Sequence, residues 1–442
     1  MKLLVLGGDG RAHTMVWKLF NSPQAGEILC APGNGGTGQL APTVDLDPTL
    51  AAGVARFAFE ENIDLIIPAD GAALQAGVVD EAVSFQVGVC GPSQRSAVLE
   101  RSRCATKAFL LRHQLPTPPG RPFADLVTAE KFLATQPMPV MIKADSPALG
   151  EAVYDDRFAA LEGLRALFQA HPLVGRSDGV VIEAYVRGPR VVMSAFTDGR
   201  SAVPLLPTRL YDRVADDDSG EQAHGIGAHT NNSRYAGLLG DFLHTKMIAP
   251  IVAGLAGEGL PYWGLLSIDC VIAADGPKIT ALRTTFHEGE AQVVLPRLED
   301  DLLPWVQAMI AQRLHELPPP RFAPVASVGL GLFAHGYPHY FASGGPISGL
   351  EDLDPGVLLF HSATENPAGL RHTPAASTGG VFSFGGSATL APQLRASGGQ
   401  PVTLVTTGAT LAGARGRALI NAERIHFEGR SYRESIAARE FA

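Results

Sequence analysis

Short apolar runs alternate with helical segments through the first hundred residues, and this alternation constrains the fold more than any other feature. The strands are expected at Leu3–Leu6, Glu27–Ala31, Asp64–Pro68 and Val87–Gly91, and the helices at His13–Phe20, Val54–Glu60 and Leu74–Phe85. A β-α-β-α-β order requires crossover connections, so it predicts a doubly wound parallel sheet.

The rest of the chain predicts two further domains. Its expected strands are Pro139–Lys143, Val180–Tyr185, Arg190–Phe196, Leu265–Ala273, Val325–Phe333, Val357–Phe360 and Pro401–Thr406, and its helices Ala105–His113, Asp156–Ala170, Phe242–Ala256, Glu299–Leu314 and Thr410–Ala422. The proline-rich segment Glu316–Pro324 indicates a linker. We therefore expect domains at 1–102, 103–317 (with a lid subdomain at about 120–188) and 325–442, the last a small α+β domain.

Composition excludes several classes of protein. The formal net charge is −9 with no basic stripe, which argues against nucleic-acid binding. The 4 cysteines form no CxxC pair, so neither a disulfide scaffold nor a cysteine zinc site is expected. The apolar start is interrupted at Gly7, and no apolar stretch reaches the ~18 residues of a membrane span. These features predict a cytoplasmic chain.

The run Gly7-Gly8-Asp9-Gly10-Arg11 follows one predicted strand and opens a helix. Backbone N–H groups at such a helix start can hold a phosphate, and Arg11 adds a permanent cation. The alternative is a plain tight turn. No acidic residue ends the second strand to hold a ribose, so NAD is not expected.

Polar residues of the central region are ambiguous. Lys143 ends an apolar strand and suits either a nucleotide phosphate or a local ion pair. Residues 146–150 suit a phosphate-covering loop, but Glu151 follows, which favours a solvated turn. The glycine- and aspartate-rich segment Tyr211–Asn232 is expected to be a long loop. Asp269 lies inside an apolar strand and suits either Mg²⁺, together with Glu288 or Glu290, or a pair with Arg283.

Several strings in colinear order resemble the glycinamide ribonucleotide synthetase family of the ATP-grasp superfamily. They are Leu6-Gly7 to Arg11, Ala31-Pro32-Gly33-Asn34-Gly35-Gly36-Thr37, Gly91-Pro92-Ser93, Ile142-Lys143-Ala144-Asp145, Val181-Ile182-Glu183, Phe286 with Glu290 and Gln292, Gly336-Tyr337-Pro338, and Tyr432-Arg433. The resemblance implies an N-terminal α/β domain like that of biotin carboxylases, an ATP-grasp domain, and a ligase that joins glycine to phosphoribosylamine with ATP and Mg²⁺ in purine biosynthesis.

The resemblance also implies roles for individual residues. It assigns ATP contacts to Arg103, Lys143, Glu183 and Tyr185, catalysis to Arg213, substrate contacts to Gly10, Arg11, Gly225 and Gly227, and Mg²⁺ to Asp269 and Glu288. The implied partners are small molecules, a ribose phosphate and an amino acid. The oligomeric state is expected to be a monomer or a homodimer.

The same resemblance shows departures where ATP and metal should bind. The family's glutamate and asparagine metal ligands fall on Ala281 and Arg283, and its ribose-contacting glutamate falls on Arg190. A lysine position is occupied by Asp212. Two alternatives therefore stand beside the purine ligase: a ligase for another acid and amine, and a catalytically silent homologue that binds a nucleotide or ribose phosphate.

Overall fold

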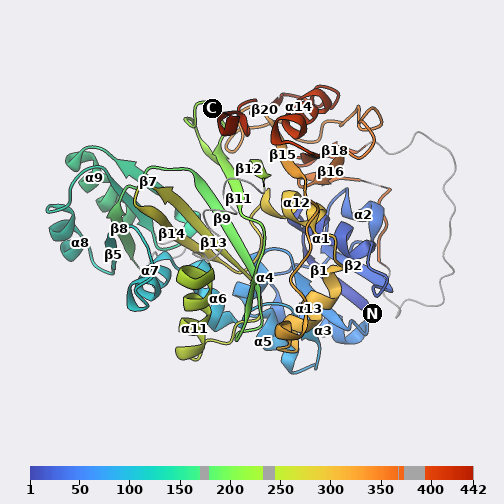
Figure 1. The fold of residues 1–442 in the computed structure, drawn as a ribbon, viewed down its shortest axis with the longest axis horizontal. Coiled ribbons are helices and arrows are strands. Elements are labelled where there is room, and N and C mark those ends of the chain that lie inside the picture. The colour runs from blue at the N-terminus through green and yellow to red at the C-terminus, as the bar shows by residue number, and fades with distance from the viewer. Residues whose placement is uncertain (170–178, 232–243, 367, 373–393, 442) are drawn as a thin grey trace.

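The computed structural model describes residues 1–169, 179–231, 244–366, 368–372 and 394–441. Three sheets of four or more strands organise these residues (Figure 1). A parallel sheet holds the N-terminal residues, a small antiparallel sheet forms the far lobe of the central region, and a long antiparallel sheet runs from the central region into the C-terminal region.

The N-terminal sheet has the order β2-β1-β3-β4 and is parallel throughout, which confirms the predicted doubly wound fold. Its strands are β1 (Lys2–Gly7), β2 (Glu27–Pro32), β3 (Leu65–Pro68) and β4 (Gly88–Val89). The helices are α1 (Gly10–Phe20), α2 (Thr37–Leu40), α3 (Ala51–Glu60), α4 (Gly71–Ala76), α5 (Val78–Val83) and α6 (Gln94–Arg101).

One expected helix is divided. Residues 74–85 were expected to be continuous, but Gly77 adopts φ 93° between α4 and α5. A left-handed glycine ends one helix and lets the next start in a new direction.

The lobe at the left of Figure 1 is a four-stranded antiparallel sheet of order β5-β8-β6-β7. Its strands are β5 (Gly120–Phe123), β6 (Val140–Ala144), β7 (Glu151–Tyr154) and β8 (Val180–Ala184), covered by α8 (Leu126–Leu133) and α9 (Arg157–Gln169). Helix α7 (Arg103–Arg112) leads into this lobe from the N-terminal domain.

The long sheet has the order β14-β13-β9-β11-β12-β15-β19-β16. Its strands are β9 (Arg190–Thr197), β11 (Thr208–Arg213), β12 (Gln222–Thr230), β13 (Gly264–Ala273), β14 (Gly276–Arg283), β15 (Ala326–Ala334), β16 (Leu358–His361) and β19 (Val402–Gly408). At its margins β10 (Ala202–Pro204) pairs with β9, and β20 (Arg430–Tyr432) pairs with β15.

The expectation of a long loop over residues 211–232 was wrong. Strands β11 and β12 pair there as a hairpin, with Leu210 opposite Ala228 and Tyr211 opposite Gly227. Strand β12 then pairs with β15, so its glycines lie inside the sheet. Residue 232 itself and the first part of the expected helix 242–256 lie outside the described residues, and α11 begins at Ala249 and ends at Gly257.

Helix α14 (Leu411–Ala422) packs on β15 and β19 in the C-terminal region. Helix α12 (Glu290–Val294) packs on α1, β12 and β15, and α13 (Leu302–Ile310) packs on α1, β9 and β13. One apolar cluster contains Val5 and Val16 of the N-terminal domain together with Val293 and Trp305. The N-terminal and central regions therefore share a core. No helix within the described ranges has the length and apolar character to cross a membrane.

Candidate active site

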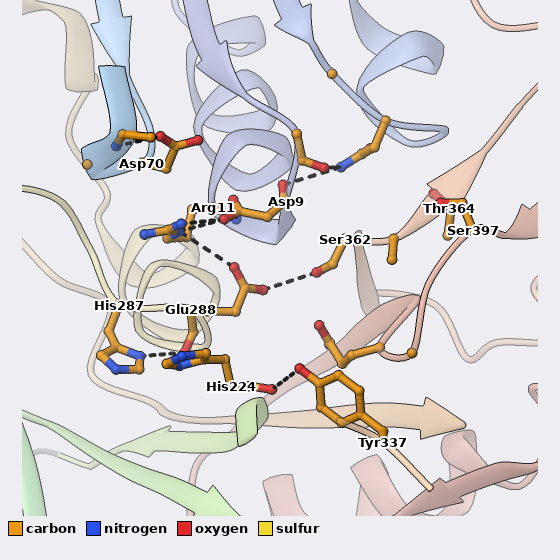
Figure 2. A pocket seen from close by; sticks show the side chains of 18 of the residues that line it. Asp9, Arg11, Asp70, His224, His287, Glu288, Tyr337, Ser362, Thr364 and Ser397 are labelled. Atoms are coloured by element: carbon orange, nitrogen blue, oxygen red, sulfur yellow. Dashed lines mark hydrogen bonds and ion pairs between the residues drawn. The ribbon is translucent and has the colours of Figure 1, made fainter. Parts of the chain in front are cut away.

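A cavity of about 760 Å³ opens where all three regions of the chain meet (Figure 2). Its walls come from loops after β1, β2 and β3, from the end of β14 and the loop before α12, and from two C-terminal loops around Ser362 and Ser397. The charged or ionisable lining residues are Asp9, Arg11, Asp70, Glu100, His224, Arg283, His287, Glu288, Tyr337 and Glu365. The carboxyl ends of parallel strands are where open α/β sheets bind ligands, so this is the favoured substrate site.

Arg11 lies at the start of α1 and is held by its neighbour Asp9. The Asp9 carboxylate accepts from Arg11 Nε at 2.8 Å and from the Arg11 backbone N–H at 3.0 Å. Burial by itself would lower the pKa of Arg11, but Asp9 and Glu288 raise it above its ordinary value. Asp9 therefore caps helix α1. Its carboxylate accepts hydrogen bonds from the backbone N–H groups that were predicted from the sequence to bind a phosphate.

Glu288 faces Arg11 across the cavity (Figure 2). Its Oε2 lies 3.7 Å from Arg11 Nε, and its Oε1 accepts from Ser362 Oγ at 3.1 Å and from Gln292 Nε2 at 2.6 Å. Burial, with the nearby Asp9 charge, raises the pKa of Glu288 to about 7. Oε2 is buried and accepts no hydrogen bond from any described residue. A carboxyl of this kind can exchange a proton near neutral pH.

Two histidines form the wall opposite the N-terminal loops. Their rings, His224 and His287, lie 5.8 Å apart between centroids. Burial and then the charge of Arg283 lower the pKa of both below the ordinary value, so both are neutral at pH 7. His287 Nδ1 lies 3.0 Å from the Glu288 carbonyl oxygen, while its Nε2 is buried with no partner among the described residues.

The glycines predicted to contact substrate, Gly10, Gly225 and Gly227, lie near the cavity but outside its lining. A Cβ on Gly10 would lie closer than 3.0 Å to the side-chain ends of Gln292, Glu288 and Ser362, so a larger residue at position 10 would force these three side chains to shift. Gly225 has φ 71°, directly after His224 in β12. A Cβ on Gly227 would meet Ile436. None of these three residues lines the cavity itself.

The nucleotide residues suggested by the sequence lie on the small lobe and partly come together. Glu183 on β8 accepts from Lys107 at 2.7 Å and pairs with Lys143 at 2.8 Å, and all three side chains are buried. Burial would raise the pKa of Glu183, but the two lysines hold it below its usual range. Tyr185 follows β8, and its backbone N–H donates to Pro139 at 3.2 Å.

Arg103 does not join this lysine cluster. It donates to the Gly150 carbonyl at 2.6 Å and pairs with Glu151 at 3.1 Å. These contacts tie the loop before β7 to the start of α7. Residues 147, 148 and 150 are exposed, which agrees with the solvated turn expected at 146–150, and the ion pair is made by Glu151 directly after it.

Asp269 is the centre of an ion-pair network on the long sheet. Its Oδ2 lies 2.7 Å from Arg190 Nη2 and 3.3 Å from Arg283 Nε, and Arg190 also pairs with Asp212. Burial would raise the pKa of Asp269, but Arg283 and Arg190 bring it well below its usual range. The pairing of Asp269 with Arg283 is therefore the alternative that the structure shows.

The residues around Asp269 do not fit Mg²⁺, which prefers several oxygen ligands in octahedral geometry. Glu288 belongs to the separate Arg11 network, and no three His, Cys, Asp or Glu residues of the described chain converge as metal ligands. At roughly 4 Å, each guanidinium opposes a doubly charged ion by about 8 kcal/mol at an effective dielectric of about 20. The carboxylates of Asp269 and Asp212 are already matched by the two guanidiniums, so the network has no excess negative charge to hold the ion.

Arg213, the expected catalytic residue, lies at the end of β11 outside the cavity lining. Its Nη1 donates to the Gly220 carbonyl at 2.9 Å within its own hairpin. Sequence reasoning missed the cavity residues Glu100, Ser362 and Ser397. Only the pairing of distant strands brings these loops together, so no local pattern identifies them.

A parallel N-terminal sheet followed by two antiparallel sheets, with a buried lysine–glutamate cluster on the smaller one, is the architecture of an ATP-grasp enzyme. The solved phosphoribosylamine–glycine ligase of Thermotoga maritima superposes with a TM-score of 0.82 at 22% identity, covering 99% of this chain and 100% of that one.

Sequence comparison identifies the family within the ATP-grasp class. Domain models of phosphoribosylglycinamide synthetase match residues 1–100 (N domain), 101–291 (ATP-grasp domain) and 327–439 (C domain). The phosphoribosylamine–glycine ligase of Caulobacter vibrioides is 33% identical over 99% of this chain and 98% of its own length, and that of Vibrio vulnificus is 31% identical over 100% and 99%. The chain belongs to the phosphoribosylglycinamide synthetase family, as its sequence predicts.

Proposed function

We propose that this chain is a phosphoribosylamine–glycine ligase, which joins the glycine carboxyl group to the amine of phosphoribosylamine and converts ATP to ADP and phosphate in purine biosynthesis. The observation that carries the proposal is one cavity built by all three family domains. The relatives named for that activity match 99–100% of this chain over 98–99% of their own lengths, so their domains all have counterparts here.

The proposed reaction has two steps. A glycine carboxylate oxygen attacks the γ-phosphorus of ATP and releases ADP. The amine nitrogen then attacks the acyl carbon, and phosphate leaves as the amide bond forms. The nitrogen must lose a proton in this second step, and Glu288 Oε2 is suited to accept it because it accepts no hydrogen bond from a described residue and its carboxyl has a pKa of about 7.

The other residues have positioning roles in this proposal. Arg11 holds Glu288 in place through the Oε2–Nε approach of 3.7 Å, and Ser362 fixes the second oxygen. Lys143 and Glu183 border the nucleotide from the small lobe. We retain Gly10, Gly225 and Gly227 as residues that shape the substrate site and Arg103 as a residue of the nucleotide side.

The test is phosphate release with glycine, freshly generated phosphoribosylamine, ATP and Mg²⁺, with each omitted in turn and the product identified by mass. Release that needs both glycine and the amine supports the proposal. Glu288→Gln should lower kcat by about 10²–10⁴-fold and remove the rise of kcat through pH 7, while the exposed control Glu428→Gln should change neither. Wild-type enzyme that releases no phosphate beyond a no-enzyme control would refute the ligase proposal.

A second candidate is a homologue that binds a nucleotide or ribose phosphate without turnover. The ion pairs of Asp269 with Arg190 and Arg283 favour it, because they oppose the Mg²⁺ that turnover of ATP would need and leave the binding of a ligand possible. Tight binding of ADP or ribose 5-phosphate by a chain that makes no product would establish this function instead.

A further inference from the structure

Arg283 presents an incompletely bonded guanidinium at the inner wall of the central cavity. It is the last residue of β14 and lines the cavity. Its Nε donates to Asp269 at 3.3 Å, but Nη1 is 4.0 Å from Glu100, beyond hydrogen-bond distance. Neither terminal nitrogen donates to any described residue. An arginine fork with open donors is well suited to a bidentate oxyanion.

Asp269 holds one side of the Arg283 guanidinium. Asp269 is 1% exposed and accepts a hydrogen bond from Arg283 Nε. Arg190 shares the same carboxylate oxygen at 2.7 Å and is itself paired with Asp212. Each guanidinium is therefore matched by one carboxylate, and Arg283 keeps its donors without being left as an unpaired charge.

The charge of Arg283 acts on the neighbouring cations. Burial lowers the pKa of Arg103; Glu151 opposes this, and the charges of Arg283 and Arg190 lower it further. The carboxylate nearest to Arg283 on its cavity side, Glu100, already accepts from the backbone N–H of Thr284 at 2.9 Å and from its hydroxyl. His287 Nε2, buried and unpartnered, lies in the same wall.

Strand β14 also connects the cavity to the nucleotide side. Lys143 of the small lobe donates to the carbonyl of Thr280, three residues before Arg283, at 3.4 Å. Arg283 therefore lies where a nucleotide's terminal phosphate and a carboxylate substrate would have to meet. A divalent cation does not fit there, because the two guanidiniums already bind Asp269.

We infer that Arg283 binds an oxyanion directly at the inner end of the cavity, without a divalent cation. The anion is a phosphoryl group of the nucleotide or the carboxylate of the amino acid. The inference rests on the proposed function only for the identity of these two anions. A chain that binds an anion at Arg283 yet makes no product would keep this inference and lose the proposed function.

The test is isothermal titration of the full chain with ADP, inorganic phosphate and glycine, each in EDTA and in MgCl₂. The variants are Arg283→Gln, Arg283→Lys and the exposed control Arg313→Gln. At least one probe should bind in EDTA, and Arg283→Gln should weaken it about ten- to a hundredfold, the range expected for a charge-assisted hydrogen-bonded pair. Arg283→Lys should be intermediate, and the control unchanged.

The probes distinguish the two anions. Weakening of ADP and phosphate alone identifies the phosphoryl group, and weakening of glycine alone identifies the carboxylate. The inference is overturned if no probe binds in EDTA, if binding appears only with MgCl₂, or if folded Arg283→Gln and Arg283→Lys bind every probe as tightly as the wild type. Adding Ala281→Glu to Arg283→Asn places a carboxylate opposite Asp269 and should make ADP binding depend on Mg²⁺.

Discussion

Replacing Gly10 with alanine tests whether the three regions of the chain depend on one close contact. The added Cβ would lie closer than 3.0 Å to the side chains of Gln292 and Glu288, and 2.7 Å from Ser362 Oγ. These atoms belong to a hydrogen-bonded group, in which Glu288 Oε1 accepts from both neighbours at 2.6 and 3.1 Å. The methyl group fits only if that group separates.

The magnitude follows from those contacts. Overpacking costs about 1–3 kcal/mol, and loss of hydrogen bonds to a charged group adds about 1.5–3 kcal/mol. Alanine returns about 0.5–1 kcal/mol of helix propensity, because Gly10 begins α1. For cooperative unfolding of 442 residues, the net loss of about 2–5 kcal/mol corresponds to a decrease in melting temperature on the order of 2–5 °C.

The assay is thermal unfolding of the wild type and of Gly10→Ala, with Gly416→Ala as the control. Gly416 lies in α14, where an added Cβ would meet no atom within 4 Å, so this change should raise the melting temperature slightly. Equal melting temperatures for Gly10→Ala and Gly416→Ala would refute the close packing described for the cavity floor.

Three further predictions follow from buried charges. Burial raises the pKa of Glu290 from its ordinary value of 4.5 to about 7, so between these pH values the folded state binds more protons than the unfolded one, and the melting temperature should fall as the pH rises from about 4.5 through 7; Glu290→Gln should reduce that fall by a few degrees in a pH series of thermal melts. Glu183→Gln should lower stability by about 3–5 kcal/mol in urea unfolding because it leaves two buried lysines without a carboxylate, whereas Glu60→Gln, in an exposed ion pair, should cost under ~1 kcal/mol. Arg433→Met should speed hydrogen exchange over residues 214–221, since the buried guanidinium bonds that hairpin tip; unchanged exchange would show that the tip is held by other contacts.

The fold was largely predictable because its strands are continuous apolar runs. Leu3–Leu6 and Val402–Thr406 stand out locally, and their alternation with helices sets the class of sheet. The β11–β12 hairpin was not predictable in the same way. Strand β12 contains Gly225 and Gly227, which are loop residues by composition, and it becomes a strand because β15 supplies hydrogen bonds along its edge.

The site was predictable in parts but not as a whole. Arg11 and Glu288 were both named from the sequence, but not as partners, because 277 positions separate them and only the shared core brings them within 3.7 Å. Ser362 comes from a third region. Such a site is a property of domain packing, and local spacing carries no information about it.

The Asp269 network shows what single positions cannot reveal. From the sequence alone, the positive charge at residue 190 and the negative charge at residue 212 are interpreted separately, each as a sign of weakened nucleotide binding. In the structure they form one ion pair, and Arg283 joins them through Asp269. The charges of these residues therefore have to be interpreted together, because they form one ion-pair network around Asp269.

The most direct test of the ligase proposal is the fate of the glycine carboxyl oxygen. With ¹⁸O-labelled glycine, phosphoribosylamine and ATP, an acyl-phosphate route transfers one labelled oxygen to the phosphate released in each turnover, which mass spectrometry of the phosphate detects. The account predicts one labelled oxygen per phosphate and an amide product that retains the other. Phosphate released without label would contradict it, because the carboxylate would then not have been the group that received the phosphoryl group.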